Sequence, residues 1–144
     1  MHLPGAALRM RGESIRQSNM PHAILEYSQN IIDVVDHHEL FRRLHEIMTS
    51  SGPFALDDIK SRIYRADHFY VADGTPHNAF VHLRIEILEG RDLAVRQAVG
   101  EGALALLRES YPESLAHLHC QLSIEIREMA KETYYKERSV AREE

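Results

Sequence analysis

The chain has 144 residues, with 17 lysines and arginines against 22 acidic residues, which gives a formal net charge of −5. With 44% hydrophobic and 27% charged residues it has the composition of one globular domain, which excludes a fibrous repeat or a wholly disordered protein. No apolar run reaches the ~18 residues that a membrane helix needs, and the negative balance argues against a nucleic-acid partner. Its single cysteine, Cys120, cannot form an intrachain disulfide, so we expect a cytoplasmic protein in a reducing environment.

The first 19 residues differ in character from the rest of the chain. They carry three arginines against one acidic residue, whereas the remainder, from Met20 on, carries 14 basic and 21 acidic residues. They contain neither the apolar stretch of a secretory signal nor a helical or strand period. We expect residues 1–19 to be a disordered leader or the result of a misassigned start, residues 21–129 to form the domain, and residues 130–144 to form a charged extension.

The first half of the domain has the pattern strand, helix, strand. A short, largely apolar run over His22–Tyr27 predicts a strand. Asp36, with Glu39 three residues later, is typical of a helix N-cap, and a Gly-Pro pair ends the helix that follows. Ile59–Val71 is expected to be extended, and Asp73–Gly74 predicts a turn. The apolar residues on one face of the expected helix are Leu40, Phe41, Leu44, Ile47 and Met48.

The second half repeats this order. From Ala79 apolar and polar residues alternate as far as Gly90, which predicts a strand with one face in the core. Asp92 is expected to cap a helix that ends near Ser110, and a second alternating run, Cys120–Ile126, predicts the last strand. The apolar residues of the first alternating run are Val81, Leu83, Ile85 and Ile87.

Equivalent elements of the two halves lie about 56 to 61 residues apart, which indicates a duplicated βαβ unit. The two strands within each unit should be parallel. We therefore predict an α+β fold, in which two βαβ units form a four-stranded sheet with two helices on one face. Because no helix is left to cover the second face, the remaining apolar area predicts association into an oligomer.

The usual catalytic and metal-binding motifs are missing from the sequence. No serine lies in a nucleophile-elbow context, and no glycine run resembles a phosphate-binding loop. The ten histidines lack a spacing typical of zinc, so we predict no metal site, and Cys120 has the position of a small core residue. The histidines and cysteine weighed as ligands are His37, His38 and His45, and His117, His119 and Cys120.

Three cations are candidates for binding an anion. Lys60 and Arg62 are two residues apart on an extended segment and therefore point to the same side. Arg91 lies at a helix start, where the helix dipole favours an anion, and arginine can bind a carboxylate through two hydrogen bonds. A solvated charged rim accounts for the same spacing equally well, so the residues alone leave both interpretations open.

Pro21 follows Met20 directly at the start of the first strand. If translation begins at Met20, removal of that methionine exposes Pro21 as a free secondary amine, which is a base. With residues 1–19 attached, the same nitrogen is an amide whose lone pair is delocalised, and it cannot accept a proton as a general base.

Several short segments, taken together, resemble one known family. They are PH at 21–22, I-x-S-R at 59–62, A-D-G at 72–74, A-F-V-H at 79–82, and Gly90–Arg91 followed by Arg96–Gln97 and Gly100–Glu101. Over about residues 21–129 the chain is similar to the 5-carboxymethyl-2-hydroxymuconate isomerases of the tautomerase superfamily, relatives of 4-oxalocrotonate tautomerase and macrophage migration inhibitory factor.

The resemblance implies a homotrimer of two-unit βαβ subunits and a cofactor-free isomerase (tautomerase) in aromatic compound catabolism, on the homoprotocatechuate route from 4-hydroxyphenylacetate. It implies the N-terminal proline Pro21 as the general base, and Lys60, Arg62 and Arg91 as the residues that bind a small carboxylate substrate. No metal, membrane or nucleic-acid partner is implied.

The sequence departs from the family pattern at Lys60, where close relatives are expected to carry arginine, and at Asp92, which replaces a serine or threonine. Lysine keeps the charge but loses the planar fork of arginine, and aspartate caps a helix as well as serine does. Two alternatives to an isomerase remain: a catalytically inactive trimeric ligand-binding or interaction protein of the same fold, and a general α+β regulatory domain that dimerises through its sheet.

Overall fold

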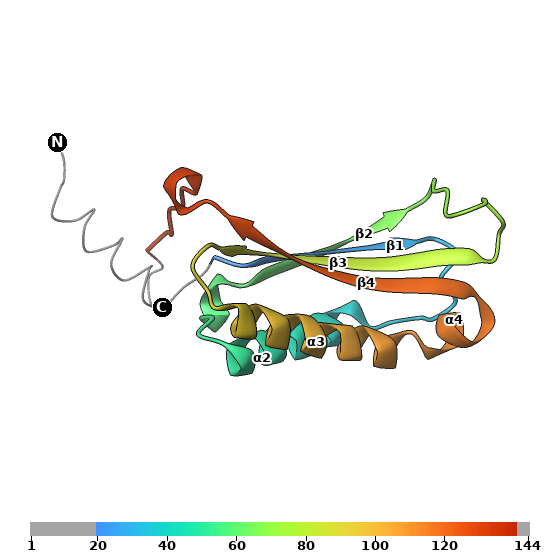
Figure 1. Ribbon diagram of the computed structural model, residues 1–144, viewed down its shortest axis with the longest axis horizontal. Helices are drawn as coiled ribbons and strands as arrows, with labels where there is room; N and C mark the ends of the chain where they lie inside the picture. Colours follow the sequence, from blue (N-terminus) through green and yellow to red (C-terminus); the bar gives the residue numbers. More distant parts are fainter. Residues whose placement is uncertain (1–19, 141–144) are drawn as a thin grey trace, which may run out of the picture.

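The computed structural model describes residues 20–140, so the expected leader, residues 1–19, lies outside the described part of the chain. Four strands form one mixed sheet in the order β2-β1-β3-β4, and the helices cover one of its faces (Figure 1). The strands are β1 (His22–Ser28), β2 (Lys60–Ala66), β3 (Asn78–Leu88) and β4 (His119–Met129). β1 is parallel to β2 and β3 to β4, whereas the central pair, β1 and β3, is antiparallel. The predicted α+β class and its two parallel βαβ units are confirmed.

Two long helices, one in each unit, connect the parallel strands. They are α2 (His37–Ser51) and α3 (Leu93–Ser110), and the shorter elements are the 3₁₀ turns η1 (Leu56–Asp58) and η2 (Lys131–Thr133) and the short helix α4 (Pro112–His117). The predicted cap at Asp36 is confirmed, since its carboxylate accepts a hydrogen bond from the Glu39 backbone N–H at 3.2 Å. α3 begins directly after Asp92 as predicted, but the Asp92 side chain makes no capping hydrogen bond.

The second strand is shorter than the sequence predicts. The expectation that Ile59–Val71 is extended throughout is wrong, because β2 ends at Ala66. Its parallel partner β1 ends at Ser28, which is opposite Ala66, so the residues that follow have no strand to pair with. The predicted turn at Asp73–Gly74 is present, with Gly74 at a φ of 83°, a conformation that favours glycine.

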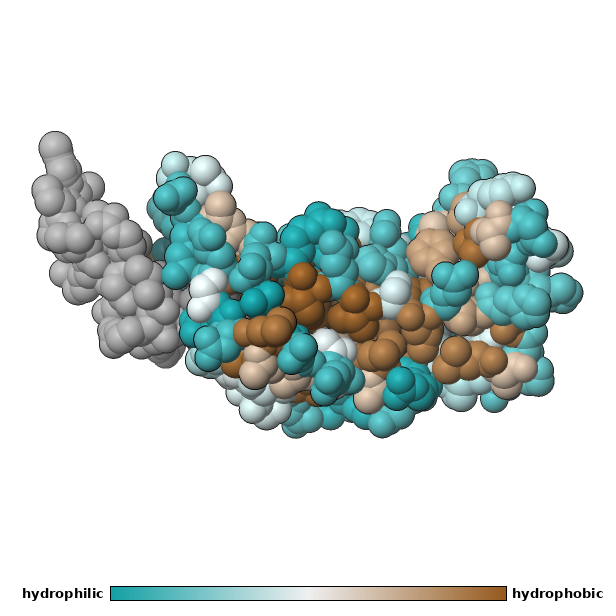
Figure 2. All heavy atoms as spheres, in the orientation of Figure 1, coloured by the Kyte–Doolittle hydropathy of each residue, from teal (hydrophilic) through white to brown (hydrophobic). Residues whose placement is uncertain are grey.

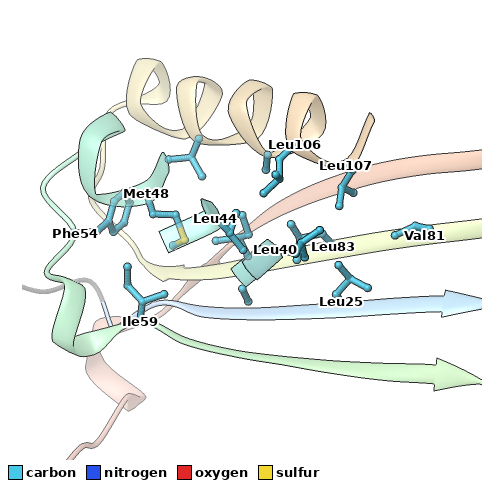
Figure 3. Packing of buried hydrophobic residues seen from close by; sticks show 14 of the residues in the cluster. Leu25, Leu40, Leu44, Met48, Phe54, Ile59, Val81, Leu83, Leu106 and Leu107 are labelled. Carbon is cyan, nitrogen blue, oxygen red and sulfur yellow. The ribbon is translucent and has the colours of Figure 1, made fainter. Parts of the chain in front are cut away.

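The core lies between the sheet and the two long helices. Figure 3 shows Leu40, Leu44 and Met48 of α2 meeting side chains of the sheet and of α3. The alternating residues of β3 are almost completely buried, as the sequence predicts; they are Val81, Leu83, Ile85 and Ile87. At the helix–helix contact, a side chain at Gly102 would lie 2.8 Å from a methyl group of Ile47, so glycine lets α2 and α3 approach closely.

The uncovered face of the sheet is more polar than the sequence analysis assumes. Ala23 and Leu25 face the core, so His22, Ile24 and Glu26 lie on the opposite face. The residues beside these three on the neighbouring strands are Lys60, Arg62, Tyr64, His82, Arg84 and Glu86. This face therefore offers little apolar area, and that part of the argument for an oligomer is wrong.

Exposed apolar area lies instead along the outer strand. A groove of about 400 Å³ runs between α3 and β4, and Figure 2 shows the apolar patch over these two elements. Its lining residues are Leu93, Arg96, Gln97, Gly100, Glu101, Leu104, Leu122, Ser123, Ile124 and Ile126. The apolar side of β4 is thus half-buried, with Cys120 included, where the alternation predicts a core strand.

Within residues 20–140, none of the helices combines the length and the apolar character needed to cross a bilayer.

Candidate functional site

Pro21 lies at one end of the sheet, which we call the site end. There β1 and β2 begin and β3 and β4 finish, because His22 is opposite both Lys60 of β2 and Glu86 of β3. The Pro21 side chain is less than 2% exposed, and its carbonyl accepts a hydrogen bond from the Lys60 backbone N–H at 3.2 Å. Pro21 is therefore held firmly beside the start of β2.

The residue before Pro21 has an unusual backbone conformation. Met20 has a φ of 46°, in the left-handed region that residues other than glycine rarely adopt. A residue before proline prefers an extended backbone, so the Met20–Pro21 connection is a point of local strain.

His22 and Arg62 are in direct contact on the uncovered face of the sheet. A nitrogen of the Arg62 guanidinium lies 3.3 Å from Nδ1 of His22, and Nε2 of His22 lies 2.9 Å from the Tyr134 hydroxyl. Because a guanidinium can only donate, Nδ1 must be the acceptor. The neutral ring therefore carries its proton on Nε2 and donates it to the oxygen of Tyr134.

Burial and nearby positive charge hold the pKa of His22 below its usual value. Partial burial of the ring is the largest cause, and the charges of Lys60 and Arg62 follow, with Glu86 opposing them. The site end therefore favours the neutral form of a basic group, and it keeps His22 in the tautomer that Arg62 and Tyr134 require.

Lys60 contacts a buried acidic residue that comes just before β2. Its ammonium group donates to the backbone carbonyl of Asp58 at 2.7 Å, and the Asp58 side chain is 5% exposed. The Asp58 carboxylate accepts hydrogen bonds from Lys136 and Arg138, which belong to the C-terminal segment. Burial, followed by the charge of Lys136, lowers the pKa of Lys60.

The structure brings three of the four predicted site residues together. Pro21, Lys60 and Arg62 are joined by direct contacts or through His22. Arg91 lies in the loop between β3 and α3, at the same end of the sheet but on the far side of β1 from Lys60. Its carbonyl accepts a hydrogen bond from Arg96 at 3.3 Å, which ties this loop to the first turns of α3.

The other candidates from the sequence do not form a site. Among residues 20–140, no group of three or more histidine, cysteine, aspartate or glutamate side chains could hold a metal ion. Burial raises the pKa of the Cys120 thiol, which disfavours the reactive thiolate. His45 of α2 lies 2.7 Å from the Ser61 hydroxyl of β2, a contact that ties the helix to the sheet.

Sequence reasoning missed the residues that come from the C-terminal segment. Residues 131–138, which we call the strap, belong to the predicted charged extension, residues 130–144, to which the sequence analysis assigns no contact within the domain. In the structure they lie against the site end of the same chain, through Tyr134 on His22 and through Lys136 and Arg138 on Asp58. Asp58 and Tyr134 carry no local sequence signal of these contacts, because their partners lie at least 78 positions away in sequence.

Comparison with known proteins gives consistent matches. A family model described as 5-carboxymethyl-2-hydroxymuconate isomerase matches residues 21–143. A curated 5-carboxymethyl-2-hydroxymuconate Delta-isomerase from Escherichia coli is 33% identical over 121 residues, which is 84% of this chain and 96% of the relative.

Solved structures match over most of the chain as well. The crystal structure of a 5-carboxymethyl-2-hydroxymuconate isomerase from Deinococcus radiodurans R1 has a TM-score of 0.80 at 30% identity, covering 87% of this chain and 94% of that one. A fused wild-type 4-OT, described as a symmetric trimer, shares the fold with a TM-score of 0.60 at 14% identity, covering 76% of this chain and 86% of that one.

Proposed function

Because the chain belongs to the 5-carboxymethyl-2-hydroxymuconate isomerase family, we propose that it converts 5-carboxymethyl-2-hydroxymuconate to its 2-oxo isomer, with Pro21 as the general base. One observation carries the proposal: the family match begins at Pro21, and that residue lies at the end of the sheet where Lys60 and Arg62 gather. In the cell the reaction would belong to homoprotocatechuate breakdown in the cytoplasm.

The reaction needs one proton to move along a conjugated system. The amine of Pro21 takes the proton from the 2-hydroxyl group and returns it to carbon C5, so that the enol becomes a ketone and the double bonds shift. One base serves both ends, provided that its pKa lies near the working pH. Negative charge develops on the 2-oxygen during the transfer, and cations aimed at that oxygen stabilise it by roughly 3 kcal/mol in comparable sites.

The surroundings of Pro21 favour the neutral amine that this chemistry requires. Pro21 is buried, and the positive charges of Lys60 and Arg62 lie on the adjacent residues of the sheet. Burial and cations both disfavour an ammonium ion and so lower its pKa. The same cations, together with Arg91 at the β3–α3 loop, would bind the carboxylates of the substrate.

The mature chain must begin at Pro21 for this mechanism to operate. A peptide bond to Met20 would leave the nitrogen without basicity. We therefore expect the protein made from its native gene to have the intact mass of a chain that starts at Pro21, and to ketonise the substrate with loss of the ultraviolet absorbance of the dienol.

Removing the base tests the role of Pro21 directly. Blocking the Pro21 amine should lower kcat by about 100-fold, the contribution of a positioned general base, whereas Pro76→Ala, in an exposed turn, should leave it unchanged. Full turnover by a chain that retains residues 1–19 would show that another group is the base. Substrate binding without turnover by the chain that starts at Pro21 would favour the inactive ligand-binding protein instead.

A further inference from the structure

The strap crosses the site end of the sheet from one edge to the other. It leaves β4 beside the end of β3, where the Lys131 backbone N–H donates to the Glu89 carboxylate at 2.9 Å. Tyr134 then meets His22 at the start of β1, and Lys136 and Arg138 reach Asp58 just before β2. Figure 1 shows this last segment at the same end of the molecule as the start of β1.

The strap brings positive charge to a place that is already positive. Lys136 and Arg138 share the one carboxylate of Asp58, and Lys60 lies close enough that both strap cations disfavour its charged form. The Asp58 carboxylate offsets part of this charge, but three cations against one carboxylate leave an excess of positive charge that favours a further anion. The Arg138 side chain is 55% exposed, so its guanidinium is accessible from solvent while the buried Asp58 anchors it.

Tyr134 ties the strap to His22 and retains its own hydroxyl proton for a further hydrogen bond. The tautomer of His22 makes the Tyr134 oxygen an acceptor, so the hydroxyl proton of Tyr134 is directed elsewhere. Burial and the nearby charges of Asp58 and Glu86 raise the pKa of Tyr134, which keeps that proton on the oxygen.

We propose that the strap is part of the substrate site, with Lys136 and Arg138 binding the carboxylate that distinguishes a tricarboxylate substrate from a dicarboxylate one, and with Tyr134 as a positioning residue. This inference rests on the proposed function, and it makes the C-terminal strap a determinant of specificity. An arginine can bind a carboxylate through two parallel hydrogen bonds, and the buried Asp58 holds Arg138 in place for such a contact.

The test compares two substrates that differ by one carboxylate, 5-carboxymethyl-2-hydroxymuconate and 2-hydroxymuconate. Lys136→Gln and Arg138→Gln should each lower kcat/KM for the tricarboxylate about tenfold, mainly through KM, with a change of less than about twofold for the dicarboxylate. Arg108→Gln, which removes an exposed cation from α3, is the matched control and should change neither value. An equal fall for both substrates, or no fall, would overturn the proposal.

Two further measurements test the strap, one with tyrosine variants and one by ligand binding without turnover. Tyr134→Phe should raise KM for the tricarboxylate alone, whereas Tyr135→Phe, at the exposed neighbouring residue, should not. If the wild-type protein ketonises neither substrate, the proposed function fails, and calorimetry still tests the strap. Propane-1,2,3-tricarboxylate should then bind more tightly than pentanedioate, and Arg138→Gln should remove the difference; equal affinities would overturn the inference.

Discussion

At the scale of single residues, the site end selects neutral bases. His22 accepts from Arg62 on one nitrogen and donates to Tyr134 on the other, so protonation of the ring would break the contact with Arg62. His45 is in a similar position, since burial lowers its pKa while it contacts the Ser61 hydroxyl. Both histidines therefore resist protonation in the folded chain.

This resistance predicts a loss of stability in mild acid. A histidine whose pKa is lowered by folding is protonated more readily in the unfolded chain, so the free energy of unfolding falls as the pH drops below about 6.5. Urea unfolding at a fixed protein concentration should show a lower midpoint at pH 5.5 than at pH 7.5. His45→Gln should reduce this difference, and His38→Gln, at an exposed position of α2, should not. A midpoint independent of pH would contradict the lowered pKa of these two histidines.

At the scale of elements, each of the two long helices has an aspartate at its N-cap position, but the two aspartates differ in whether their side chains cap the helix. The Asp36 carboxylate accepts from the Glu39 backbone, whereas the Asp92 side chain makes no capping bond. The short helix α4 is capped from a distance, because the Asp33 carboxylate accepts from the backbone N–H groups of Glu113 and Ser114 at 2.8 and 2.9 Å. Spacing within the sequence locates the first two helices but carries no sign of the third.

The two aspartates therefore form a matched pair for measuring a cap. Asp36→Ala should lower the free energy of unfolding by about 1 kcal/mol, because an orphan backbone N–H loses its acceptor. Asp92→Ala should cost roughly half of that or less, since only its charge near the helix N-terminus is lost. Denaturant unfolding of both variants gives the comparison, and equal losses would show that the Asp92 carboxylate caps α3 in solution.

At the scale of the whole molecule, the apolar groove between α3 and β4 lies along an edge of the sheet. β4 is the outer strand on that side, so its outer backbone groups have no strand partner within the described sheet. The groove and the open edge together are a surface suited to a second copy of the chain, so they support an oligomer, for which the family resemblance implies a homotrimer.

Sedimentation equilibrium should therefore give a molecular mass three times that of the mature chain. Leu104→Glu, which places a charge in the groove, should weaken the assembly at low micromolar concentration. Leu56→Glu, at an exposed leucine outside the groove, is the matched control and should leave the mass unchanged. A monomeric wild-type protein would contradict the trimer.

The sequence by itself determined the order of the four strands and two long helices and, to within a residue or two, where they start, because alternation, helix caps and the 56 to 61 residue spacing are local or repeated signals. It also singled out Pro21, Lys60 and Arg62 as candidate site residues, and the parallel pairing of β1 with β2 makes them neighbours. Only the tertiary structure decided where β2 ends, which face is polar, and what the strap contacts. The end of β2 depends on where its partner β1 ends, and the strap contacts depend on pairs such as Tyr134 with His22 and Arg138 with Asp58, which are far apart along the chain and meet only when the sheet has formed.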